Sequence, residues 1–130
     1  MPDSIPEEVA DLLTSGVHVA HLATSYEDRP HVAPVWYDYR DGAIEIVTTG
    51  KKLDNIRRNP RVALSVQDGD GGNAQWGLTL RGTATVVEDD DEGREILHRI
   101  NDRYGADEDD WAENTAVRID VGSANYWTYD

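Results

Sequence analysis

The sequence contains no cysteine and no phenylalanine, and only two of its 12 basic residues are lysines. Without cysteine the chain has no disulfide, no thiolate nucleophile and no cysteine-ligated zinc or iron–sulfur site. No apolar run reaches the roughly 18 residues that a membrane span needs. The amino-terminal stretch MPDSIPEEVADLL lacks the basic start and apolar centre of a signal peptide. We therefore expect a cytoplasmic protein with no membrane partner.

Acidic residues outnumber basic residues by 26 to 12, which gives a formal net charge of −14. The acids occur in every segment, whereas an acidic interaction tail would carry them in one block. A surface of this kind repels itself unless salt screens it, and it is typical of a halophilic protein. The same charge repels the phosphate backbone of nucleic acids, so we expect no nucleic-acid partner.

The length of 130 residues indicates a single domain that spans residues 1–130. Apolar residues at helical spacing predict three helices, at residues 4–13, between Gly50 and Pro60, and at 92–104. Alternating apolar and polar residues predict six antiparallel strands, at residues 17–25, 31–40, 43–49, 61–67, 75–88 and 115–122. Gly82, inside the fifth strand, is expected to mark a bend or bulge that lets the sheet close into a small barrel. The predicted fold class is α+β, mostly β, with short flanking helices.

Both lysines lie in the stretch TTGKKLDNIRRNP, residues 48–60. On a helical wheel Lys52 flanks the inner face, with Asn55 one turn away, and Thr48 and Thr49 immediately precede the helix. Hydroxyls, free backbone N–H groups, an ammonium and an amide then converge at a helix amino terminus, which is a typical anion site. The predicted target is a phosphate. Two other interpretations stay open: an ordinary solvated helix surface, and a DNA-reading helix, which the net charge opposes.

A longer series of motifs contains this stretch. It begins with HVAHLATSYEDRPHVAPVWYDYRDGAIEIVTTGKKLDNIRRNPRVALSVQD and continues into LRGTATVVED, so it spans about residues 17–105. The "LAT" strand, the "P-x-x-x-P-V-W" strand, the "DG" hairpin and "T-T…K-x-x-N-I…N-P-R-V-A-L" follow one another in an order that resembles the FMN-binding split-barrel proteins related to pyridoxamine 5′-phosphate oxidase. One departure is the glycine that usually stands before Pro30, which is replaced here by Asp28 or Arg29.

The resemblance implies a homodimeric split β-barrel that carries two FMN sites at the subunit interface and acts on a small-molecule substrate. By position in the motifs, it assigns the cofactor's phosphate to Thr48, Thr49, Lys52 and Asn55. By the same comparison, it places four residues along the flavin ring: Pro34, Val35, Trp36 and Tyr37. Of the aromatic residues near the carboxyl terminus, we expect Trp127 or Tyr126 to reach the cofactor across the dimer. The arginine-rich motifs of pyridoxamine 5′-phosphate oxidase itself are absent, so oxidation of vitamin B6 is not expected.

Three functions remain open. The first is an FMN-dependent oxidoreductase that transfers hydride through the flavin, and the second is a reductase of the same fold that uses the deazaflavin coenzyme F-420. The third is a flavin-binding, stress-related module without turnover. No nucleophile with its base can be identified, so no catalytic residue is assigned; in flavin proteins the cofactor supplies the chemistry. No metal site is expected, because His18 and His21 would point to opposite faces of a strand and His98 is isolated.

Overall fold

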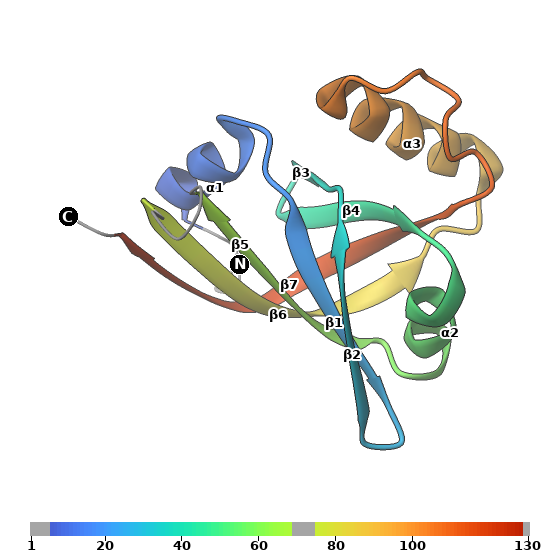
Figure 1. Ribbon diagram of the computed structural model, residues 1–130, viewed down its shortest axis with the longest axis horizontal. Helices are drawn as coiled ribbons and strands as arrows, with labels where there is room; N and C mark the ends of the chain where they lie inside the picture. The colour runs from blue at the N-terminus through green and yellow to red at the C-terminus, as the bar shows by residue number, and fades with distance from the viewer. Residues whose placement is uncertain (1–5, 69–74, 129–130) are drawn as a thin grey trace.

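Three helices and seven strands form the described part of the chain, residues 6–68 and 75–128 of the computed structural model (Figure 1). In chain order they are α1 (Glu7–Thr14), β1 (Ala20–Tyr26), β2 (Arg29–Val35), β3 (Asp38–Arg40), β4 (Ala43–Thr48), α2 (Gly50–Arg58), β5 (Arg61–Asp68), β6 (Trp76–Val86), α3 (Asp90–Tyr104) and β7 (Thr115–Thr128). The α+β class and the three helices are confirmed. The first two residues of the helix predicted at residues 4–13 lie outside the described residues.

The sheet has seven strands, so the prediction of six was wrong. The sequence pattern indicated one strand over residues 31–40, but the chain changes partners in the middle of it. β2 pairs with β1, whereas β3 pairs with β4. Burial continues to alternate through the break, since Val35 and Tyr37 are buried while Trp36 between them is partly exposed. The period-two pattern therefore carried no sign that the hydrogen-bonding partner changes.

The strand order β2-β1-β5-β6-β7-β4-β3 explains how the sheet curls. All neighbouring strands are antiparallel, and the two strands at the opposite edges, β2 and β3, are consecutive in the chain. The short link of Trp36 and Tyr37 joins them, so the edges must come together. Figure 1 shows the result, with β1 and β2 running steeply across the direction of β6 and β7.

β7 extends past the predicted end at Gly122 and pairs with β6 as far as Thr128. Arg81 pairs with Ser123 while Gly82 pairs with Val121, so Gly122 is an extra residue in the ladder. The bend or bulge predicted at Gly82 is confirmed as an irregularity between Arg81 and Gly82, with the extra residue on the β7 side. A Cβ on Gly82 would come within 2.4 Å of the Asp120 carbonyl oxygen, so this close approach of two backbones requires glycine.

The main core fills the concave side of the sheet with aliphatic side chains of β1, β4, β5, β6 and β7. Val9 and Leu13 of α1 are fully buried against it. A second, smaller cluster joins α3 to the opposite face of β4 and β7, through Ile96, Ile100 and Ala116. No helix in the described ranges is both long and apolar enough to cross a membrane.

A buried carboxylate lies between α3 and the sheet. The Glu45 side chain is 0% exposed, and it accepts hydrogen bonds from Arg99 and Arg118 at 2.9 Å and from Arg40 at 3.3 Å. Burial alone would raise the pKa of Glu45, but hydrogen bonds and charge from Arg99 and Arg40 outweigh burial and lower the pKa. Three strands and one helix are thus joined through a single ionised group.

Candidate functional site

A hollow of about 430 Å³ lies between the amino terminus of α2 and the link that joins β2 to β3. It brings together six of the nine residues assigned by the sequence: Pro34, Val35, Trp36, Thr48, Thr49 and Lys52. Hydrophobic side chains together with hydroxyl and ammonium groups give it the mixed lining of a small-molecule site.

The amino terminus of α2 has the charge pattern of an anion site. Its first turn contains no acidic residue, although the chain is strongly acidic, and it contains Lys51 and Lys52 instead. Thr49, the N-cap residue, uses its side chain for no capping hydrogen bond. Lysines at the positive end of a helix are unfavourable unless an anion offsets them. Within the described residues Lys52 forms no ion pair, so its charge remains available to a ligand.

α3 shows the contrast within the same chain. Its first turn contains three acids, and the Asp89 side chain accepts a hydrogen bond from the Glu92 N–H at 2.9 Å. The two helices are therefore built differently: a side chain caps the amino terminus of α3, whereas α2 has no side-chain cap and begins at Thr49, which lines the hollow.

Thr48 supplies the most specific local observation. Its side chain is 2% exposed, lines the hollow, and has no hydrogen-bond partner for Oγ1 among the described residues. A buried hydroxyl without a partner destabilises a fold by roughly 1–3 kcal/mol. An acceptor atom placed in the hollow would remove that penalty.

The Trp36 ring forms one wall of the hollow and is backed by a second ring that is not part of the lining. Trp36 lies on Tyr104 of α3 with ring centroids 4.7 Å apart and an interplanar angle of 6°. The Tyr104 hydroxyl accepts a hydrogen bond from the Tyr37 N–H at 3.2 Å and donates one to the His18 carbonyl oxygen at 2.5 Å. Burial raises the pKa of Tyr104, so the hydroxyl stays protonated and keeps its donor. The wall is therefore held in place by α3 and by the segment before β1.

Two of the assigned residues do not line the hollow. Asn55 is 5% exposed, and its amide donates a hydrogen bond to Thr24 Oγ1 at 3.1 Å, which fastens α2 to β1. Tyr37 is fully buried, and its hydroxyl donates to the Leu13 carbonyl oxygen at 2.8 Å beneath α1. Both side chains thus have partners inside the fold.

The last assigned residue, Trp127, lies in a different hollow. It lines a space of about 820 Å³ together with His18 and His21. Val19 lines both hollows, so the two adjoin within one chain. The indole of Trp127 lies across Gly77, where a Cβ would come within 2.4 Å of the ring.

Sequence reasoning missed the residues that the loop between α3 and β7 brings to the site. Trp111 and Asn114 line the first hollow, and Trp111 is 52% exposed with φ of 63°. The only signal in the sequence was one large aromatic residue inside the acidic loop ADEDDWAEN. A loop residue in the left-handed region has no periodic pattern that could reveal it.

The sequence analysis treated His98 as isolated, but in the structure it has two acidic neighbours. Its Nε2 lies 3.0 Å from Asp109 Oδ1, and its Nδ1 lies 3.7 Å from Glu108 Oε2. These three side chains could in principle hold a metal ion, but both acids are exposed. Asn101 donates hydrogen bonds to the carbonyl oxygens of Glu108 and Asp110, which fixes the same loop. The contacts of His98 and Asn101 therefore explain how this loop is held against α3.

The family model described as pyridoxamine 5′-phosphate oxidase matches residues 5–128. No curated protein matches the sequence.

Solved structures with the same architecture include a conserved hypothetical protein from Mycobacterium tuberculosis. It is 28% identical, with a TM-score of 0.80 over 98% of this chain and 88% of that chain. An F-420 reductase is also 28% identical, with a TM-score of 0.71 over 93% of this chain and 98% of that chain. An FAD-binding protein from Mesorhizobium loti is 21% identical, with a TM-score of 0.70 over 94% of each chain, and this likeness concerns the fold.

Proposed function

Because this chain belongs to the pyridoxamine 5′-phosphate oxidase family, we propose that it is an FMN-binding oxidoreductase acting on a small molecule. The single observation that carries the proposal is the Thr48 hydroxyl, which is buried, has no partner among the described residues, and lines the same hollow as Lys52. Thr48, Thr49, Lys52 and the N–H groups of the α2 amino terminus would hold the phosphate of FMN. The ring would lie along Pro34, Val35 and Trp36.

A bound flavin supplies two-electron chemistry at its ring, and the chain's own residues bind and orient it. Asn55 and Tyr37 would not contact the cofactor directly. Each forms a hydrogen bond that fixes a segment carrying a residue of the lining. Trp36, held in place by its stacking on Tyr104, would keep water from one side of the ring. No side chain is assigned a proton-transfer role.

A deazaflavin reductase is the second candidate, and the F-420 reductase of similar structure is the observation that favours it. Both candidate cofactors have a tricyclic ring and a phosphate, so they predict the same contacts at Thr48 and Lys52. The absorbance spectrum of the purified protein distinguishes them, because a flavin and a deazaflavin absorb at different wavelengths.

Replacement of Thr48 by valine tests the phosphate assignment. Valine keeps the shape but removes the unpartnered hydroxyl, so we expect the free energy of unfolding of the cofactor-free protein to rise by about 1 kcal/mol. The same change should weaken FMN binding by about tenfold. Chemical unfolding and equilibrium titration measure the two effects.

Thr24→Val is the matched control for this experiment. Thr24 is equally buried at 2% exposed, but its hydroxyl accepts the Asn55 hydrogen bond, so valine there should destabilise the protein. If Thr48→Val instead destabilised the cofactor-free protein and left FMN binding unchanged, the hydroxyl would have a role in the fold and the phosphate assignment would fail.

We also propose that two copies of the chain form the working unit. Six large apolar side chains remain more than a third exposed in the described residues: Val17, Val19, Val32, Trp111, Tyr126 and Trp127. Apolar surface left uncovered in one chain commonly marks a contact between chains. Sedimentation equilibrium in high salt should therefore give twice the chain mass of 14.5 kDa. A monomer under those conditions would contradict the proposal.

A further inference from the structure

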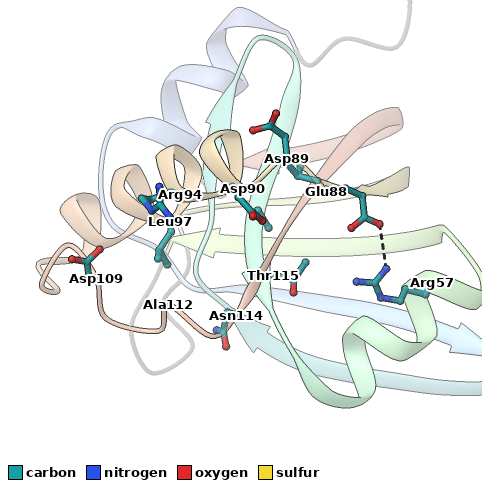
Figure 2. A pocket seen from close by; sticks show the side chains of 13 residues that line it. Arg57, Glu88, Asp89, Asp90, Arg94, Leu97, Asp109, Ala112, Asn114 and Thr115 are labelled. Atoms are coloured by element: carbon teal, nitrogen blue, oxygen red, sulfur yellow. Dashed lines mark hydrogen bonds and ion pairs between the residues drawn. The ribbon is translucent and has the colours of Figure 1, made fainter.

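A second crevice, of about 290 Å³, lies beside the proposed phosphate end of the site (Figure 2). α3, the end of α2 and the loop before β7 surround it. Asn114 lines both the crevice and the hollow. Thr115, which lines the crevice, pairs across the sheet with Thr48, which lines the hollow. The crevice therefore adjoins the position at which Thr48 would hold a phosphate.

The crevice is acidic. Four carboxylates line it, from Glu88, Asp89, Asp90 and Asp109, against two guanidinium groups. Both guanidinium groups already have acidic partners: Arg57 lies 3.4 Å from Glu88, and Arg94 lies 3.6 Å from Asp91. Figure 2 shows the Arg57–Glu88 pair across one side of the opening. No unpaired cation among the described lining residues remains to hold an incoming anion.

The candidate cofactors differ at this end of the molecule. FMN ends at its phosphate, whereas coenzyme F-420 continues through a phosphodiester into a tail of glutamates, each with a carboxylate. Glu88 and Asp109 are largely exposed to solvent, but at low ionic strength like charges at close range still repel one another. Carboxylates in the crevice would therefore oppose such a tail and act less on a phosphate held outside the crevice at the α2 amino terminus.

Building on the FMN site proposed above, we propose that the acidic crevice selects the cofactor by its tail. It admits a cofactor that ends at the phosphate and rejects one that continues into an anionic chain. Glu88 and Asp90 are the residues to which we assign this selection, since the capping hydrogen bond of α3 is made by Asp89 and not by either of them. The inference depends on the proposed position of the phosphate at Thr48.

The test compares FMN with coenzyme F-420 carrying short and long glutamate tails, by equilibrium titration of the intact protein. For the natural chain, F-420 affinity should fall as the tail lengthens. In the double variant Glu88→Gln, Asp90→Asn, affinity for the long-tailed form should rise by about threefold to tenfold at low ionic strength, because two nearby repulsive charges are removed. FMN affinity should change by less than about twofold. At about 1 M salt, where the Debye length is about 3 Å, the gain should disappear.

The control variant is Glu95→Gln, Asp102→Asn, which removes two exposed charges from α3 away from the crevice. If it gave the same gain as the crevice variant, net charge rather than the crevice would control affinity, and the inference would be overturned. Affinity of the natural chain that rose with tail length would overturn it as well. Failure of FMN and F-420 to bind would overturn the proposed function and this inference together. Tight FMN binding with a preference for long tails would overturn the inference alone.

Discussion

Glutamine in place of Glu45 is expected to lower the free energy of unfolding by about 3 kcal/mol. Removing one partner of a buried ion pair typically lowers the free energy of unfolding by roughly 3–5 kcal/mol. The lower end of this range applies here because the guanidinium groups are partly exposed. Arg40, Arg99 and Arg118 would face one another without the carboxylate between them. Urea unfolding of both proteins in the same high-salt buffer measures the difference.

The pH dependence gives this prediction a second readout. The folded-state pKa of Glu45 lies below its ordinary value, so the stability from its ionised form is fully present above the ordinary carboxyl range. The difference in free energy of unfolding between the natural chain and the Glu45→Gln variant should therefore stay constant from neutral pH to about pH 4.3 and shrink below that pH. Glu88→Gln is the matched control, because its pair with Arg57 is exposed and should contribute less than about 1 kcal/mol. Equal stability of the natural chain and the Glu45→Gln variant would contradict the prediction.

Alanine in place of Lys52 is expected to weaken FMN binding by about 10- to 150-fold. This corresponds to roughly 1.5–3 kcal/mol for a charged hydrogen bond. The loss is partial because the α2 amino terminus and the hydroxyls of Thr48 and Thr49 stay in place. Folding should hardly change, since Lys52 forms no ion pair in the described structure.

Riboflavin is the control ligand, because it has the same ring without the phosphate. Its weaker binding should respond little to Lys52→Ala. Lys51→Ala is the control variant, since Lys51 is exposed and does not line the hollow. If Lys52→Ala weakened the binding of FMN and riboflavin equally, or did not weaken FMN binding, the phosphate assignment would be wrong. The lysine-containing face of α2 would then be an ordinary solvated helix surface.

The sequence predicted elements well where the determining signals are local. Gly50 and Pro60 bracket α2, and the predicted helix between them is confirmed as Gly50–Arg58. Gly82 marked the irregularity in β6, because a single residue without a Cβ is enough to allow the close approach. At both places the information lies within a few residues of the feature.

The sequence failed where the outcome depends on residues far along the chain. A helical wheel placed Asn55 near Lys52, but it could not show that Thr24, 31 residues earlier, would accept the Asn55 hydrogen bond. β2 pairs with β1, whereas β3 pairs with β4 at the other edge of the sheet. This change of partner follows from the curvature of the whole sheet and not from any feature of residues 31–40. Gly122 predicted a strand end because an isolated glycine is compatible with both an end and a bulge.

The hydroxyl of Tyr104 has a consequence for motion. It is the acceptor for the Tyr37 N–H and the donor to the His18 carbonyl oxygen, so one atom ties α3 to the strand link and to the segment before β1. The Tyr37 amide can therefore exchange its hydrogen with solvent only when α3 lifts away from the sheet. Its exchange rate reports the opening equilibrium of α3, and the Trp36 wall belongs to the same cooperative unit.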